Sequence, residues 1–473
     1  MIVLPFFQLS CKKTIDLNPT HTLDGDVAFK QISDYEAALT GAYSRLLSVN
    51  YYGSSNGSNA FATLSDMMTD NLFESGESLG NYQSFSHWTY TADEPNIEAT
   101  WLAAYRVIQQ ANLTLRNIDA LSADAPGAVN RIKAQALALS GFVHFDILRY
   151  WGEGSQRNST LKGIPYSSSF DIEQKPARLS VKASYDAIIN DLMQAKLLMQ
   201  NMDKPIQSAT STASTARGYV DEIATNAMLA RIYNYAAEPD SAIKYASLAI
   251  AARPLASRTN FPLVWQDAST ADVIWSVKFT PLNSGTGDNV YYATGNRASY
   301  RPATNLLSLY DVSNDIRYTS FFQVRPRGSS SRLVLTKYLA KQSQLATPDG
   351  ITDFKVLRTG EMYLIRAEAY ANKGLDGLAL ADLNSLRAAR INGFIAGTET
   401  GAALVTAIFN ERRKELVAEG HRWFDLKRTT RVVNRTTNCS VFCTLGSTAR
   451  EWAWPIPQSE ILANKNIEQT TGY

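Results

Sequence analysis

The sequence predicts a mainly α-helical protein, in which tetratricopeptide-like helix pairs carry large loop-rich insertions and a few short strands. Three observations support this fold class. Long stretches repeat apolar residues at helical spacing, two segments share the small-residue pattern of tetratricopeptide repeats, and turn residues dominate two blocks, 51–100 and 255–357. With 473 residues, 45% of them hydrophobic, the chain can bury one large core or two to three ordinary ones.

Helical periodicity is clearest over residues 131–153. Apolar or small residues recur there at i, i+3, i+4 and i+7, which is the stripe of a buried helix face, and the glycines of "WGEG" end the pattern. The same spacing predicts a second helix over 184–199 and a third over 111–121.

Two further segments resemble tetratricopeptide repeats. Small residues let two antiparallel helices approach, a tyrosine fills the gap beside them, and a proline or glycine ends a helix. In the first segment (228–254) the pattern is carried by Ala230, Tyr233, Ala242, Ala249 and Pro254. In the second (361–390) it is carried by Ala367, Tyr370, Ala379 and Leu383. An ordinary pair of helical hairpins would look similar. We expect Asp240 to cap the second helix of the first pair.

The block between these repeats differs in kind from the helical stretches. It holds β-like runs at 273–279 and 332–339 among turn-rich segments, so a true solenoid is interrupted here. We expect it to pack against the helices as a separate feature. Residues 208–218 read as a low-complexity solvent loop, and both loop-rich blocks are places where function tends to reside.

Composition argues against several classes of function. The 46 basic and 44 acidic residues form no run of five like charges, so nucleic acid is not an expected partner. The four histidines are far apart and none pairs with a cysteine at zinc spacing, so we expect no metal site and no other cofactor. The sequence has no stretch of 18 or more apolar residues, so no transmembrane helix is predicted.

An isolated cysteine stands near the start, in "QLSCKK" (8–13). The apolar "MIVLPFF" precedes it, and the order Leu9-Ser10-Cys11 resembles a bacterial lipobox, although Gln8 stands where leucine is usual. In that interpretation Cys11 is the lipidated first residue of the mature protein, and the lipid holds it at a membrane. The alternative is an ordinary thiol in a disordered terminus.

Several segments in order along the chain resemble the SusD/RagB family of cell-surface lipoproteins from Bacteroidetes. They are "SCKKTIDLNP", "GFVHFDILRYWGE", "GIPY", "LRTGEMYLIRAEAYANKG", "LNSLRAAR", "ERRKELVAEGHRWFDLKR" and "WPIPQSEILAN". The last three are the most diagnostic, and the match spans essentially the whole chain from Cys11.

The resemblance implies a right-handed superhelical scaffold of helix pairs in one globular unit. Residues 1–11 would be a signal peptide and lipobox, followed by an N-terminal SusD-like part (12–225) and a C-terminal SusD/RagB part (226–473). It also implies a lipid-anchored protein on the outer membrane, at the cell surface, that caps a SusC-type TonB-dependent transporter. Such proteins bind a glycan, or in some members a peptide, and no catalysis is expected.

Two loop clusters could contact a sugar, whose C–H faces stack on aromatic rings and whose hydroxyl groups bind polar side chains. One is "NYQSFSHW" (81–88) and the other is "YYATGNRASYRP" (291–302). In the family the binding surface comes from loops of these two regions. The predicted ligand residues are Tyr82, Trp88, Tyr292 and Arg297. Aromatic residues in long loops also serve as plugs that anchor the loop.

Acidic residues in the first loop-rich block allow other interpretations of the function. A glycoside hydrolase would need two of them across the sugar, with Asp66, Asp70, Asp93 and Glu94 as candidates. The segment with Asp66, Asp70 and Asn71 could instead orient the binding surface or hold a cation. A third possibility is a tetratricopeptide adaptor that binds a protein tail.

Other clusters favour structural roles. Glu, His and Asp lie close together in 411–428, in a predicted helix through Gly420, and His144 neighbours Asp146. Such groups suggest acid–base chemistry, but we favour buried ion pairs that fix helix packing. Gly420 inside a helix would suit a second backbone packing there. Cys439 and Cys443 could form a local disulfide.

Overall fold

The computed structural model describes residues 29–54, 57–171, 173–206, 217–281 and 285–473. The leader and Cys11 lie outside the described residues, as does most of the predicted solvent loop. The longer helices are α2 (Ile32–Arg45), α5 (Pro95–Leu115), α6 (Pro126–Trp151), α7 (Val181–Leu198), α8 (Glu222–Tyr235), α9 (Pro239–Ala252), α13 (Thr359–Asn372), α14 (Asp376–Ala388) and α15 (Gly401–Glu415). The shorter ones are α3 (Ser65–Met67), α4 (Gln83–Ser86), α10 (Phe261–Trp265), α11 (Thr304–Leu307), α12 (Ile316–Phe321), α16 (Arg422–Arg428) and α17 (Gln458–Ala463).

Strands are short and occur only in antiparallel pairs within the described part of the chain. The pairs are β1 (Leu72–Glu74) with β7 (Tyr300–Pro302), β2 (Lys162–Pro165) with β3 (Arg178–Ser180), β4 (Val273–Val277) with β10 (Phe354–Arg358), β5 (Tyr291–Tyr292) with β6 (Arg297–Ala298), β8 (Phe322–Arg327) with β9 (Ser330–Leu335), and β11 (Val433–Asn434) with β12 (Thr444–Leu445). The predicted mainly helical class is confirmed, and the predicted strands over 273–279 and 332–339 correspond to β4 and β9.

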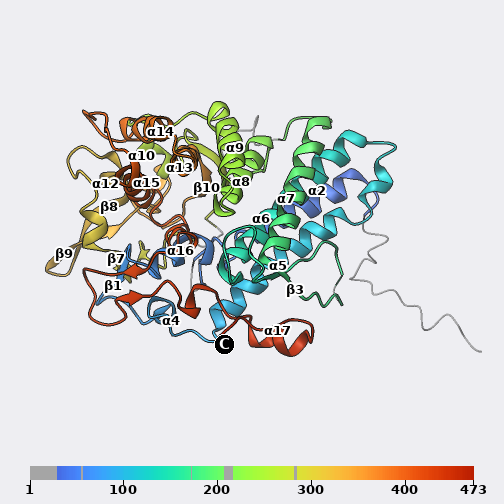
Figure 1. Cartoon of the computed structure of the whole chain (residues 1–473), viewed down its shortest axis with the longest axis horizontal. Helices are drawn as coiled ribbons and strands as arrows, with labels where there is room; N and C mark the ends of the chain where they lie inside the picture. Colours follow the sequence, from blue (N-terminus) through green and yellow to red (C-terminus); the bar gives the residue numbers. More distant parts are fainter. Residues whose placement is uncertain (1–28, 55–56, 172, 207–216, 282–284) are drawn as a thin grey trace, which may run out of the picture.

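One end of the molecule is a bundle of α2, α5, α6 and α7, seen on the right of Figure 1. Helix α6 begins five residues before the predicted start, at Pro126, whose fixed φ suits the first turn of a helix. The predicted third helix over 111–121 is confirmed only up to Leu115, as the last part of α5. Asn117 has φ 62°, a left-handed conformation that ends α-helical hydrogen bonding, so α5 stops at Leu115 and a 3-10 turn follows.

The two predicted repeats form the helix pairs α8–α9 and α13–α14. They stack directly, because α9 packs against α13 although about a hundred residues separate them in sequence. Ala242, Ala249 and Ala367 are fully buried, as close packing of the helices requires. The expected cap is wrong, since Glu238 holds the N-cap position. Asp240 lies in the first turn of α9 and pairs with Lys373.

The intervening block leaves the helical frame after α9 and returns through β10. Strands β10 and β4 pair with Phe354 opposite Val277, and the chain enters α13 directly after β10. The block therefore starts and ends at one place on the frame. Its strands β7, β8 and β9 lie at the lower left of Figure 1, beside β1 from the N-terminal loop block.

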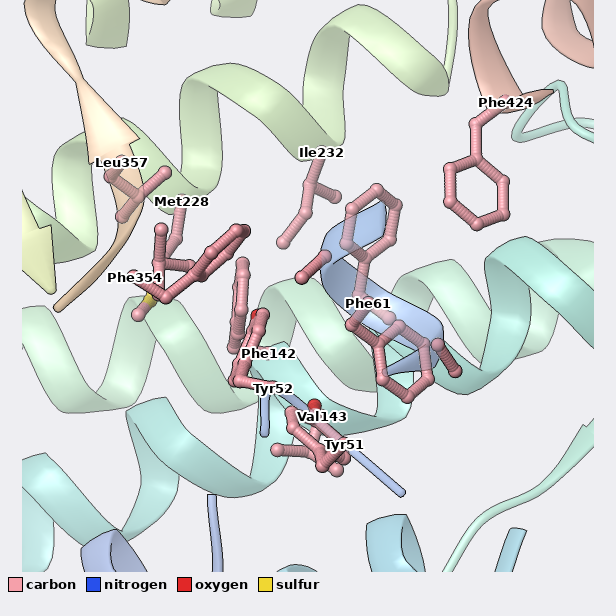
Figure 2. Close-up of a cluster of buried hydrophobic side chains, with 14 of the residues drawn as sticks. Tyr51, Tyr52, Phe61, Phe142, Val143, Met228, Ile232, Phe354, Leu357 and Phe424 are labelled. Atoms are coloured by element: carbon pink, nitrogen blue, oxygen red, sulfur yellow. The ribbon is translucent and has the colours of Figure 1, made fainter. Parts of the chain in front are cut away.

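The hydrophobic core joins both halves of the sequence. Figure 2 shows Tyr51, Tyr52 and Phe61 from the N-terminal loop block packed against Phe142 of α6 and Phe354 of β10. The rings of Tyr52 and Phe354 stack with centroids 4.7 Å apart. The irregular block at 51–100 is thus anchored in the core at its beginning.

The predicted helix through Gly420 is interrupted. Helix α15 ends at Glu415 and α16 begins at Arg422, and Gly420 between them has φ +77°. A Cβ atom at this position would lie 2.3 Å from the carbonyl oxygen of Phe61. Gly420 is therefore required both by its left-handed conformation and by the backbone that packs on it.

Replacing this glycine should destabilise the protein more than its conformation alone explains. Gly420→Ala adds the cost of left-handed backbone, about 1–2 kcal/mol, to an overlap that costs about 1–3 kcal/mol. Gly374 is the matched control, because it also has positive φ but has no atom within 4 Å of its Cβ position. Urea unfolding of the two alanine variants measures the difference, and equal losses would contradict the packing role of Gly420.

Candidate functional site

A hollow of about 240 Å³ brings together three of the four predicted ligand residues. Tyr82 comes from the start of α4, and Tyr292 and Arg297 come from the β5–β6 hairpin. The other residues that line it are Asn81, Asp288, Asn289 and Ser299. Both loop blocks that the sequence singled out therefore contribute to one site.

The β5–β6 hairpin displays an aromatic ring beside a positive charge. Tyr292 and Arg297 are directly opposite in the antiparallel register, and the guanidinium carbon lies 5.7 Å from the ring centroid. The ring packs over Gly295, where a Cβ atom would lie 2.4 Å from Cδ1 of Tyr292. Tyr292 is 40% exposed, so much of its ring is accessible on the surface of the hairpin.

Two residues that the sequence did not single out hold this hairpin in place. The Glu77 carboxylate accepts a hydrogen bond from the Ala298 N–H (2.8 Å) and two from the Arg332 guanidinium (2.6 and 3.0 Å). Arg332 also donates to the carbonyl oxygen of Asn296 (2.8 Å), in the turn of the hairpin. These charge-assisted bonds fix the hairpin between the loop after β1 and strand β9.

Tyr82 forms the floor of the hollow. Its side chain is buried, and its hydroxyl donates to the carbonyl oxygen of Gly57 and lies 3.3 Å from Oδ1 of Asn289. Burial raises the pKa of Tyr82 to about 12, so the phenol stays neutral near pH 7. Tyr82 can therefore offer a ring edge and a fixed hydroxyl, but no charge.

Trp88 does not line the hollow. Only 7% of its surface is exposed, its indole N–H donates to the carbonyl oxygen of Met68 (2.9 Å), and the Arg435 guanidinium covers its ring at 4.3 Å. This is the position of a plug that anchors the loop. Contact with a ligand would require Arg435 to leave the ring.

The structure adds Asp288, Asn289 and Ser299 to the site. Asp288 is the notable member, because its Oδ1 is buried without a hydrogen-bond partner among the described atoms. Burial, with the nearby Asp349, raises the pKa of Asp288 to about 7. Its place directly before the predicted aromatic cluster, in "GDNVYY", was the one available signal in the sequence.

The carboxylates proposed for hydrolysis do not meet in the hollow. Asp66 is fully buried and accepts from Asn71 (2.6 Å), and burial raises its pKa to about 6. Asp70 binds Arg422 through both oxygens, each at 2.9 Å. Of the other two candidates, Glu94 caps α5 and Asp93 is not among the lining residues. Among the residues that line the hollow, Asp288 is the one that carries a carboxyl group.

The side chains of the segment with Asp66, Asp70 and Asn71 are also not available to bind a cation. Asp66 and Asp70 are occupied by internal partners, and the Oδ1 atom of Asn71 accepts from Arg413 (2.6 Å). Over the whole described part of the chain, no group of three or more His, Cys, Asp and Glu residues is placed to hold a metal ion.

The charged residues of 411–428 form the buried ion-pair network that we favoured over acid–base chemistry. At its centre Arg358 contacts Asp272 (2.7 Å), Glu415 (2.8 Å) and Glu419 (2.7 Å), and all four side chains are almost completely buried. Burial opposes ionisation of Glu415, but Arg390, Arg358 and Arg317 hold its pKa well below the usual range. The Glu415 carboxylate is therefore ionised near pH 7 and is held by guanidinium groups, as expected of a structural ion pair.

His144 and Asp146 are also structural. Burial lowers the pKa of His144 to about 3, so the ring is neutral, with Nδ1 at 2.8 Å from the Ser140 carbonyl and Nε2 accepting from the Ser167 N–H at 3.1 Å. Asp146 accepts from the hydroxyl of Tyr51 (2.7 Å) and pairs with Arg149.

Removing one charge from the network should strongly destabilise the fold. Glu415→Gln leaves three buried guanidinium groups short of a counter-charge, which should cost about 3–5 kcal/mol. Asp119→Asn is the matched control, because its carboxylate is 69% exposed and pairs with Lys133 at the surface, a contact worth about 0–1 kcal/mol. Denaturant unfolding compares the variants, and similar losses would contradict the role of the network.

The network should also set the acid limit of stability. Burial opposes ionisation of Glu411, but Arg317, Lys414 and Arg387 lower its pKa to about 2. Its unfolded pKa is about 4.3, so its stabilising contribution is complete above that value and is lost as the pH falls towards 2. Thermal unfolding between pH 6 and pH 2 should show this decline, whereas unchanged stability down to pH 2.5 would contradict it.

Cys439 and Cys443 form a disulfide at the tip of the β11–β12 hairpin. The ring of Phe442, inside this small loop, stacks on His87 with centroids 4.5 Å apart. Arg435 donates from the same hairpin to the Ser86 carbonyl (2.7 Å) while it covers Trp88. The hairpin thus braces the loop that carries Tyr82 and Trp88.

Comparison with known proteins decides the family. A family model described as "SusD family" matches residues 290–473, and a second, described as "Starch-binding associating with outer membrane", matches residues 17–235. The chain belongs to the SusD/RagB family. The SusD-like protein P2 of Formosa agariphila is 24% identical over 98% of this chain and 97% of its own length, and the SusD-like protein P38 of that organism is 22% identical over 98% and 96%.

Solved structures share the fold. A SusD superfamily protein from Bacteroides thetaiotaomicron superposes with a TM-score of 0.81, at 24% identity, over 93% of this chain and 100% of that one. A protein from Bacteroides vulgatus described as a putative sugar binding protein gives 0.77, also at 24% identity, over 94% and 99%. Across the described residues of this SusD-family protein, every helix is too short or too polar to cross a membrane.

Proposed function

We propose that this protein binds a glycan at the hollow between α4 and the β5–β6 hairpin, without chemically changing it. The observation that carries the proposal is the exposed ring of Tyr292 next to Arg297, above a buried polar floor. A sugar can stack its C–H face on such a ring while its hydroxyls bind amide, guanidinium and carboxyl groups. Two solved relatives are themselves described as sugar or carbohydrate binding proteins.

We infer the cellular role from family membership. In this proposal a lipid on Cys11 holds the protein at the outer face of the outer membrane, and a SusC-type TonB-dependent transporter receives the glycan from it. The second family model, whose description names association with the outer membrane, supports this placement.

Two alternatives use the same surface. A peptide, as in RagB-like members, could place an aromatic side chain on Tyr292 and its carboxylate on Arg297. A glycoside hydrolase is less well supported, because the lining residues include one carboxylate, Asp288, where that chemistry needs two.

A binding screen separates these functions. Isothermal titration of the purified protein against oligosaccharides and against peptides of similar size should give saturable binding to a glycan. Incubation with the bound glycan should release no new reducing ends. Binding of peptides alone would favour the first alternative, and new reducing ends would overturn the non-catalytic role.

The two aromatic residues of the prediction should behave differently on truncation. Tyr292→Ala should keep the unfolding temperature and lose stacking, which weakens glycan binding by about 1–3 kcal/mol. Trp88→Ala should lower stability by about 3–5 kcal/mol, because it empties a buried site and leaves Arg435 without its ring. Calorimetry and thermal unfolding measure both effects, and unchanged affinity in Tyr292→Ala would contradict the site.

A further inference from the structure

Arginines gather around the hollow although the chain as a whole is almost neutral. The full sequence holds 46 basic and 44 acidic residues. Five arginines nevertheless lie on the neighbouring strands β6 to β9, and they are Arg297, Arg301, Arg325, Arg327 and Arg332. The local excess of positive charge is therefore a property of this surface and does not follow from composition.

These strands form one continuous surface beside the hollow. The amide of Asn296, next to Arg297, donates to the carbonyl of Pro326 in β8 (2.8 Å). Arg301 in β7 donates through Nε to the carbonyl of Leu333 in β9 (3.2 Å). Arg325 and Arg332 are directly opposite in the β8–β9 register. The strands that carry the arginines are thus joined by two side-chain to backbone hydrogen bonds and by the β8–β9 pairing.

Among the described residues, Glu77 is the one acidic group that pairs with these arginines; Asp288, in the lining of the hollow, and the nearby Asp349 form no ion pair with them. Glu77 pairs with Arg332 (2.6 Å) and approaches Arg327 (3.6 Å). Arg297, Arg301 and Arg325 form no ion pair with any residue that the structure describes. The Nε atoms of Arg297 and Arg325 are, in addition, buried without a hydrogen-bond partner in that part of the chain.

The contrast with the interior of the same protein is informative. Arg317, Arg358 and Arg390 are buried, and each contacts at least two carboxylates. The fold therefore neutralises these buried guanidinium groups, whereas Arg297, Arg301 and Arg325 have no carboxylate partner among the described residues. A guanidinium fork matches the planar oxygens of a carboxylate and the oxygens of a sulfate ester.

We propose that the hollow selects glycans that carry anionic groups, either uronate carboxylates or sulfate esters, and that Arg297 contacts the anion. This inference rests on the proposed glycan-binding function and specifies its ligand class. Tyr292 would stack on the ring of the sugar while Arg297, opposite it on β6, binds the charged substituent. Arg301, Arg325 and Arg327 would raise the local potential for a charged chain.

Protonation of Asp288 would assist the binding of an anionic glycan. The charged and titratable groups around it are Asp349, Arg297, Tyr82 and Tyr292. Burial and Asp349 already raise the pKa of its carboxyl to about 7, and a bound anion would raise it further. Binding should then take up a proton, so affinity for an anionic glycan should be higher at pH 6 than at pH 8.

The test is calorimetric titration with oligosaccharides drawn equally from neutral, uronate-bearing and sulfate-bearing polysaccharides. The tightest ligand should be anionic. Reducing its carboxylates to alcohols, or removing its sulfates, should weaken binding at least tenfold, and the treatment that does so identifies which anion is bound. Raising the salt concentration should narrow this gap, because screening weakens charge pairing.

Variants assign the effect to the hollow. Arg297→Gln should abolish the preference for the charged form, Arg297→Lys should keep part of it, and Asp288→Asn should remove the dependence on pH. Arg106→Gln is the control, because Arg106 is an exposed arginine on α5, which contributes nothing to the hollow. Each variant is first checked for an unchanged unfolding temperature.

The outcomes are distinct. Equal or tighter binding of the uncharged form by the wild-type protein would overturn this inference and leave glycan binding intact. A preference that survives in Arg297→Gln would overturn the assignment to Arg297. Absence of binding to every oligosaccharide would overturn the proposed function together with this inference.

Discussion

The buried charge of Arg358 determines which distant segments of the chain must come together. A guanidinium group without water must be matched by carboxylates, and here they come from three other places: Asp272 before β4, Glu415 at the end of α15 and Glu419 in the turn after it. These segments must therefore meet where β10 enters α13. The long block between α9 and α13 is tied at both ends to one point, so the stacked helix pairs can continue as if it were absent.

The meeting of these segments also fixes the position of the candidate site. The block between α9 and α13 carries the β5–β6 hairpin, and β7 of the same block pairs with β1 of the N-terminal loop block. Two loop regions far apart in sequence are thereby brought to one hollow, with Glu77 and Arg332 holding the hairpin. The rigidity comes from the frame and from charge-assisted bonds. The residues that line the hollow offer two tyrosine rings, two amides, a guanidinium group, a hydroxyl and a single carboxyl group.

Sequence reasoning recovered the features that depend on local pattern. The helix pairs follow from the spacing of small residues, β4 and β9 follow from short apolar runs, and the site regions follow from aromatic residues in loops. It failed where a distant segment decides. Gly420 depends on the Phe61 carbonyl, and Trp88 is covered by Arg435, more than 300 positions later. Asp288 precedes the predicted aromatic cluster in the sequence, but its burial beside Asp349, which makes it unusual, is visible only in the structure. The break at Asn117 was missed because the apolar period continues through it.

The central claim is that a glycan binds where Tyr292 and Arg297 lie opposite each other in the β5–β6 hairpin. A crystal structure of the protein with a bound oligosaccharide tests it most directly. The account predicts a sugar ring stacked on Tyr292, with a polar or charged substituent within hydrogen-bond distance of Arg297. A glycan bound elsewhere on the molecule, with the hollow between α4 and the β5–β6 hairpin filled only by solvent, would contradict it.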